Sequence, residues 1–309
     1  MAEEAGAAEP APAQPSEPVE PLAGADVGSL VTHAIGLSVG SMKEHQEGLR
    51  AGEDPDHVRK TRVALRRLRS NLRTFGEFLD RERTEPVVAQ LGALAAELGG
   101  VRDREVLAGR IRADAKALPE TEREPVGELT RVLEEEIRTA RASTVAYLDS
   151  ERFTKLFADL ESLATDPPLT VAAGRPAAAV AGPLAAGPWE KLRKGIRSLP
   201  HDPPDAQLHR IRILAKRARY AAQAVEPAVG EPARAYAAAA AELQTILGEH
   251  QDAITTEAWL AAAARGDSAF VAGRLAGLER AKAIEMRGRW REAWKTLSAR
   301  DLRAWMEPT

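Results

Sequence analysis

Apolar residues recur along most of this chain at intervals of three and four, the spacing that places them on one face of an α-helix. The pattern begins near Val27 and continues almost to the C-terminal residue, and no convincing strand pattern interrupts it. Glycine, proline and Asp-Pro mark the ends of the separate runs. The predicted helices cover residues 28–49, 56–80, 84–98, 103–117, 122–148, 151–164, 184–198, 205–225, 231–247, 250–264, 268–285 and 287–304.

Two segments lack this pattern. Residues 1–26 consist almost entirely of Ala, Pro and Glu, and they cannot bury enough apolar surface to offset the entropy of ordering, so we predict a disordered tail. Residues 165–183 are rich in Pro and Gly and are predicted to form a linker. The chain is therefore expected to be all-α, with one helical bundle over residues 27–164 and a second over 184–306.

Composition narrows the functional classes. The chain has no Cys, which excludes disulfides and thiolate chemistry and is compatible with a reducing cytoplasm, where we expect the protein to reside. Its longest apolar stretch, 176–188, holds three prolines and is too short to span a bilayer. The acidic N-terminus has no apolar region typical of a secretory signal. With a net charge of only −3, a charge-based function must come from local clusters.

The strongest cluster is VRKTRVALRRLRSNLRTF, residues 58–75, which has seven Arg or Lys residues and no acid. On a helix, five of its arginines fall within an arc of roughly 80°, beside an apolar stripe that includes Leu65, Leu68 and Leu72. We call this arc the first strip. Its members are Arg59, Arg62, Arg66, Arg69 and Arg73.

The cluster is repeated. LHRIRILAKRARY, residues 208–220, aligns with residues 58–70 at an offset of 150, and LGEHQD, 247–252, aligns with LGGVRD, 98–103, at an offset of 149. Two matches in the same order predict duplication of a bundle and a two-lobed, pseudo-symmetric molecule. The second strip comprises His209, Arg212, Lys216, Arg219 and the neutral Gln223.

Each strip concentrates like charge, although like charges one helical turn apart cost about 0.2–0.5 kcal/mol each. A solvated surface is one interpretation, but Arg predominates over Lys, and Arg suits bidentate contacts to phosphate. A linear polyanion would satisfy both strips. Nucleic acid remains an alternative, although neither strip has interleaved aromatics for base stacking or an Asn/Gln pattern for base edges. A bare phosphate polymer needs only the cations.

The spacing H-x-x-R-x-x-x-K-R-x-R-Y that begins at His209, together with RVALRRLRS, LGGVRD and LGEHQD, resembles the CHAD family, the conserved histidine α-helical domain. The resemblance covers about residues 28–306. It implies two four-helix bundles related by a pseudo-twofold axis around a basic groove or pore that binds inorganic polyphosphate, without catalysis, in proteins associated with polyphosphate granules. The strips and the resemblance give as polyphosphate-binding candidates Arg59, Arg62, Arg66, Arg67, Arg69, Arg73, His209, Arg212, Lys216, Arg217 and Arg219.

The chain departs from the family pattern at the first histidine position, where Arg59 stands. His57 lies roughly 200° around the helix from that position and cannot substitute for it. Arg59 keeps a permanent cation, so binding is expected to depend less on pH there than at His209. Arg67 and Arg217 lie off the main arc and are equally suited to clamping neighbouring helices. Weaker secondary candidates are Arg138, Arg141, Lys282 and Arg289.

No motif predicts catalysis, a cofactor or a metal. The E-x-E-x-K signature of a triphosphate tunnel enzyme is absent, since EEEIR, 134–138, ends in Arg within a helical run. There is no P-loop, no H-E-x-x-H and no Cys/His cluster. Asp103 and Asp252 are expected to open helices as caps or to pair with a nearby Arg rather than to act as catalytic carboxylates. An enzyme that processes phosphate chains stays as the alternative class, and oligomeric state is left open.

Overall fold

The computed structural model describes residues 22, 24–52, 54–266 and 268–307, and within these ranges it contains eleven α-helices and no strand. The helices are α1 (Val27–Glu44), α2 (Gln46–Ala51), α3 (Pro55–Thr74), α4 (Arg81–Ala115), α5 (Arg123–Leu148), α6 (Glu151–Thr165), α7 (Ala177–Arg197), α8 (Asp205–Val229), α9 (Glu231–Ala263), α10 (Ser268–Leu297) and α11 (Arg300–Arg303). The predicted all-α class is confirmed. In the part described, no helix is both long and apolar enough to cross a membrane.

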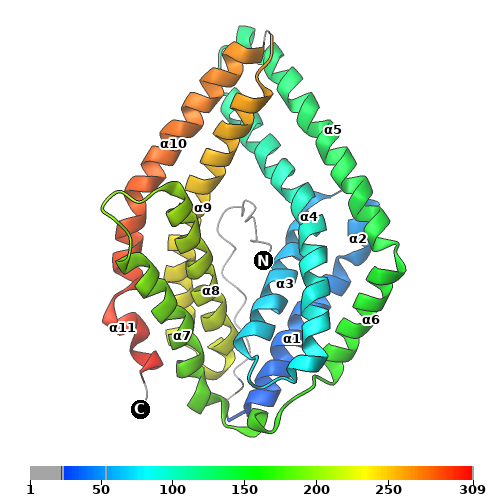
Figure 1. Ribbon diagram of the computed structural model, residues 1–309, viewed down its shortest axis with the longest axis vertical. Helices are drawn as coiled ribbons and strands as arrows, with labels where there is room; N and C mark the ends of the chain where they lie inside the picture. Colours follow the sequence, from blue (N-terminus) through cyan, green and yellow to red (C-terminus); the bar gives the residue numbers. More distant parts are fainter. Residues whose placement is uncertain (1–21, 23, 53, 267, 308–309) are drawn as a thin grey trace.

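The helices form two lobes that meet at an apex and again at a base (Figure 1). The first lobe contains α1 to α6 and the second α7 to α11. At the apex, α10 contacts α4 and α5, and α4 contacts α9. At the base, α3 and α1 contact α8, and α1 contacts α7. The lobes are therefore joined at both ends, while the pseudo-twofold relation between them remains a prediction.

Three apolar clusters hold this arrangement. One fills the first lobe and is built mainly from Leu, Val and Phe of α1, α3, α4 and α6. A second fills the second lobe between α7, α8, α9 and α10 and is rich in Ala, with Trp189 and Trp290 as its largest side chains. The third joins α4, α5, α9 and α10 at the apex, around Leu133, Leu260 and Leu275. The apex is thus a packed joint rather than a loose linker.

Several predicted helix boundaries are wrong, and glycine accounts for two of them. The runs predicted at 84–98 and 103–117 form one helix, α4, and those at 231–247 and 250–264 form one helix, α9. Gly99 and Gly248, taken as breaks, lie inside these helices against arginine side chains of the neighbouring helix. Similarly, α10 continues through residue 286, and the run predicted at 28–49 is divided at His45.

The segment predicted as a linker, 165–183, is only partly non-helical, because α7 begins at Ala177 and includes Pro183 and Pro188. Its first turns pack against both lobes: Val180 belongs to the first core cluster and Ala181 to the second. Burial of this Ala-rich face therefore outweighs the hydrogen bonds that the prolines remove.

The predicted disordered tail, 1–26, lies outside the described residues at 1–21 and 23. Its last residues are ordered in the structure. The Leu22 N–H donates to Pro227 O at 3.0 Å, Ala177 N–H donates to Ala25 O at 2.9 Å, and Asp26 caps α1 through the Ser29 N–H. This short segment is fixed to both α8 and the start of α7.

Candidate anion-binding site

The two predicted strips lie on α3 and α8, the inner helices of the two lobes, which contact each other (Figure 1). Helix α3 starts where Asp54 accepts the Asp56 N–H at 2.8 Å and Pro55 occupies the first turn. The apolar stripe of Leu65, Leu68 and Leu72 is buried in the first lobe. The strip is adjacent to this stripe on the helix, and its member Arg62 lies against α4.

Arg62 is the deepest member of the first strip, with 9% of its surface exposed. Its Nη2 lies 3.6 Å from Asp103 Oδ1 on α4, a charge contact longer than a hydrogen bond. The guanidinium passes over Gly99, where a Cβ would come within 3.1 Å of Nη1. Glycine at that position therefore allows Arg62 to lie flat on α4 one turn before the aspartate. We call Arg62, Gly99 and Asp103 the first arginine unit.

Arg212 occupies the equivalent place in the second lobe and is only 2% exposed. It lies against Gly248 of α9, where a Cβ would be 3.4 Å from its Nε. Asp252 follows Gly248 by four residues, and the Arg212 charge acts to lower its pKa against the effect of burial. We call Arg212, Gly248 and Asp252 the second arginine unit. In each lobe the structure thus brings together the basic-helix motif and the Gly-Asp motif that are repeated in the sequence.

The two units meet where α4 crosses α9. Burial raises the pKa of the Asp103 carboxyl above its ordinary value, while Arg62 and, from the other lobe, Arg212 act in the opposite direction. Burial also raises the pKa of Asp252 to about 7, and the charge of Asp103 adds to this effect. Both aspartates line a single cavity of about 220 Å³. Each aspartate lies within a long helix, so neither caps a helix, whereas the expected pairing with arginine is present at Asp103.

The other members of the first strip become more exposed toward the helix ends. Arg59 is half-exposed, and its Nε donates to Asp56 Oδ1 of its own helix at 2.7 Å. Arg66 and Arg69 are half-buried in the middle of α3, and Arg73 is exposed at its end. The first strip therefore begins at Arg59, whose charge Asp56 partly neutralises, continues past the buried Arg62 and ends at the exposed Arg73.

In the second strip, Arg219 is buried, and its Nη1 donates to Gln244 Oε1 of α9 at 3.3 Å. Its guanidinium also lies 5.6 Å from the centroid of the Tyr220 ring. Lys216 is half-buried between Arg212 and Arg219. His209 is half-buried too, and burial followed by the charge of Arg212 lowers the pKa of its imidazole, so the ring is neutral at pH 7.

The two arginines off the main arc are both half-buried. Arg67 lines a pocket of about 110 Å³ between α1, α3 and α8, together with Tyr220 and Gln223. His57 packs against Gly48 and makes an edge-to-face contact with His45, on the α2 side of α3. That position agrees with the expectation that His57 does not replace the missing histidine at Arg59.

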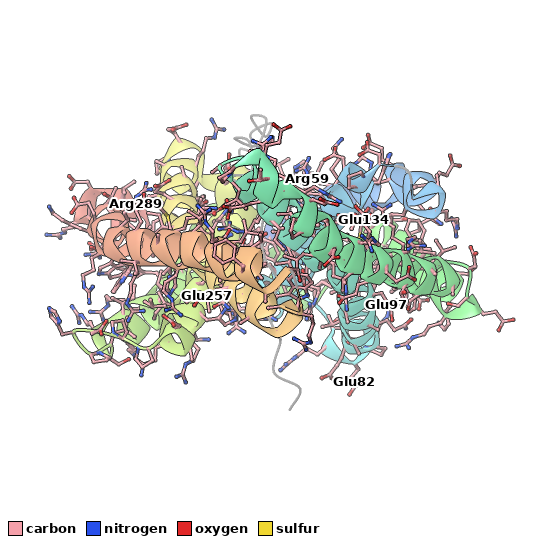
Figure 2. All side chains as sticks on the ribbon, turned by 90° about the horizontal axis from the view of Figure 1, so that it is seen from above. Arg59, Glu82, Glu97, Glu134, Glu257 and Arg289 are labelled. Atoms are coloured by element: carbon pink, nitrogen blue, oxygen red, sulfur yellow. The ribbon has the colours of Figure 1, made fainter. Side chains whose placement is uncertain are left out.

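The four secondary candidates all pair with carboxylates. Their partners are Glu135 for Arg138, Glu105 for Arg141, Asp114 and Glu279 for Lys282, and Glu285 for Arg289. Seen from above, Arg289 lies on the outer flank of the second lobe, well away from Arg59 (Figure 2). Their charges are already compensated, so the function proposed below does not depend on them.

The sequence pattern does not reveal the position of three further residues. Gly99 makes room for the buried Arg62, Gly248 lies in ordinary contact with Arg212, and Gln244 accepts a hydrogen bond from Arg219. The glycines left a signal, because they occupy the same place in the two copies of LGGVRD and LGEHQD. Among the described residues, no group of three or more His, Cys, Asp or Glu is arranged to hold a metal ion.

Comparison with known proteins agrees with this arrangement. Residues 33–261 match the CHAD domain family. The chain is 30% identical over 232 residues to the uncharacterized proteins MT2285 and Rv2226, from two strains of Mycobacterium tuberculosis, covering 71% of this chain but only 44% of theirs.

Two solved structures share the fold. One is the CHAD domain from the plant Ricinus communis, with a TM-score of 0.72 and 23% identity over 94% of this chain and 97% of that chain. The other is PptA from Streptomyces chartreusis, with a TM-score of 0.70 and 21% identity over 88% of this chain and 100% of that chain. Since the family match covers well over half of the sequence and includes both strips, the chain belongs to the CHAD domain family.

Proposed function

We propose that this protein binds linear inorganic polyphosphate, without transforming it, through the first and second strips. The observation that carries the proposal is the pair of arginine units. Arg62 and Arg212 come from equivalent helices of the two lobes, and both are held against a glycine near the crossing of α4 and α9. Membership of the CHAD family supports the same ligand.

The strips provide the chemistry that a phosphate chain requires. Guanidinium groups donate two parallel hydrogen bonds to phosphoryl oxygens, and successive strip members are separated by about 5–6 Å along the helix, given 1.5 Å per residue. Burial of Arg62 and Arg212 lowers the local dielectric and strengthens their attraction to an anion. The candidates at the helix ends, Arg59 and Arg73, then extend the contact. Attachment to cytoplasmic polyphosphate granules follows as part of the proposal.

Titration separates this function from its alternatives. Polyphosphate of defined chain length and duplex DNA with the same number of phosphates are titrated into the full chain at 50 and 200 mM salt. We expect polyphosphate to bind at least about 10-fold more tightly than DNA at both concentrations, with log K falling linearly with log salt. Tight DNA binding with weak polyphosphate binding would overturn the proposal. Release of orthophosphate that a chelator abolishes would favour an enzyme instead.

A further inference from the structure

The crossing of α4 and α9 brings together two carboxylates that a site for anions does not need. Asp103 and Asp252 line the same cavity, together with Glu136 of α5 and Thr255 of α9. Each is also the last residue of an arginine unit, so an acidic group lies beside each of the buried arginines Arg62 and Arg212. A carboxylate in this position competes with phosphate for the guanidinium, and its charge must be accounted for.

Asp252 is the more deeply placed of the two. It is 3% exposed, and its Oδ1 is shielded from solvent and accepts no hydrogen bond from the described residues. The nearest hydroxyl in its own helix does not serve it, because Thr256 Oγ1 donates to the backbone oxygen of Asp252 at 2.8 Å. A buried carboxylate oxygen without a donor disfavours the ionised form.

The charged groups that face Asp252 do not offset the effect of burial on its carboxylate. Arg212 of α8 and Arg110 of α4 favour the carboxylate, whereas Glu249 of α9 and Asp103 of α4 oppose it. Arg110 is itself engaged, through Nη1 with Glu249 at 2.7 Å and through Nη2 with Glu279 of α10 at 2.6 Å.

On the α5 side of the cavity, Glu136 is paired with Arg104 at 2.9 Å. Arg212 is therefore the principal cation left to Asp252, and burial keeps the pKa of Asp252 near 7.

We propose that Asp252, with Asp103 facing it, is a positioning residue of the polyphosphate site that takes up a proton when the phosphate chain binds. The inference rests on the proposed function. A phosphate chain along the strips brings negative charge to Arg212 and so disfavours the neighbouring carboxylate. Protonation of Asp252 removes one competing charge and leaves Arg212 to the ligand. A divalent cation is a poorer occupant, because Arg62, Arg102, Arg104 and Arg212 all act on Asp103.

The sign of the effect follows from linkage. If binding raises the proton affinity of Asp252, protonation raises the affinity for polyphosphate by the same factor. Affinity should therefore increase as the pH falls from about 8.5 to 6.5. His209 acts in the same direction: its pKa is lowered from 6.5 in the free protein, and a bound anion raises it. The difference between wild type and an Asp252 variant therefore isolates the aspartate.

The test is calorimetry of the full chain with long-chain polyphosphate, in which end groups are few, at constant ionic strength. We expect the wild-type Kd to rise about 10-fold from pH 6.5 to 8.5. Binding heats at pH 7.5, measured in two buffers of different ionisation enthalpy, should show uptake of a substantial fraction of a proton. This second measurement needs no variant.

Asp252→Asn mimics the protonated side chain. It should bind at pH 8.5 more tightly than wild type does at that pH, and it should take up a smaller fraction of a proton than wild type. Asp301→Asn, at an exposed position on α11, is the matched control and should keep the wild-type slope. Wild-type binding that is independent of pH, or an Asp252→Asn variant that keeps the slope, would overturn the inference. Absence of any polyphosphate binding would instead overturn the proposed function.

Discussion

The two arginine units contain the same three residue types at the same spacing, yet they differ in depth. In the first lobe the Asp103 side chain is 40% exposed and lies 3.6 Å from Arg62. In the second lobe Arg212 and Asp252 are both almost completely buried, and only there is the carboxyl pKa raised to about 7. One sequence pattern therefore yields a partly exposed charge pair on one side and, on the other, an almost completely buried pair whose carboxyl pKa is about 7.

The apolar stripes beside the strips account for this difference. Helix α3 packs through Leu65, Leu68 and Leu72, whereas α8 has Ala215, Ala218 and Ala222 at the corresponding positions. Small side chains allow neighbouring helices to approach more closely. Closer packing around α8 removes water from Arg212 and Asp252, and desolvation then determines the protonation of the aspartate. The two units therefore differ in how deeply they are buried rather than in the identity of their charged residues.

The largest expected effect comes from reversing charge on both strips at once. Arg66→Glu and Lys216→Glu each replace an attraction with a repulsion, so each alone should weaken polyphosphate binding about 10-fold or more, and the double variant about 100-fold or more. Titration at low salt measures both. Lys155→Glu with Lys295→Glu, at exposed positions on α6 and α10, makes the same change in net charge and should have little effect. Equal losses in the control would mean that net charge, not the strips, governs binding.

The next effect concerns stability. Arg212→Ala leaves Asp252 buried without its principal cation and should lower the free energy of unfolding by about 3 kcal/mol. Arg62→Ala should cost only about 1 kcal/mol, because the partly exposed Asp103 is hydrated in its absence. Urea denaturation of the two variants at pH 8 compares them directly. Equal losses would contradict the difference in depth between the units.

The smallest effects are expected at the two glycines. A Cβ at Gly99 would lie 3.1 Å from Arg62 Nη1, so Gly99→Ala should displace the guanidinium and weaken polyphosphate binding roughly 3-fold. A Cβ at Gly248 would make an ordinary contact with Arg212, so Gly248→Ala should leave binding unchanged. It should also stabilise α9 by up to about 1 kcal/mol through helix propensity. Titration with polyphosphate measures binding, and thermal unfolding measures stability. A stronger loss of binding in Gly248→Ala than in Gly99→Ala would contradict this expectation.

The same glycines show how far sequence reasoning reaches. Periodicity predicted an all-helical chain and the repeat located both basic helices, because these features are local. The glycines were interpreted as breaks, since glycine is intrinsically unfavourable within a helix. In the structure both lie inside a helix against an arginine about 37 residues earlier in the chain, Arg62 or Arg212, and only at Gly99 is the space too tight for a Cβ. Rules based on neighbouring residues do not capture a contact between a glycine and an arginine so far apart in the sequence. The depth of Asp252 was equally hidden, because it depends on how closely α9 packs.

The contacts between the lobes at both the apex and the base have a mechanical consequence. Two lobes that are joined at only one end could move apart to admit a ligand. Lobes that are joined at both ends cannot do so unless one of the two sets of contacts breaks. The two basic helices are thus held in a fixed relative position in the ligand-free protein. Preorganisation of this kind lowers the entropic cost of association, and it favours ligands that are thin enough to enter without separating the two lobes.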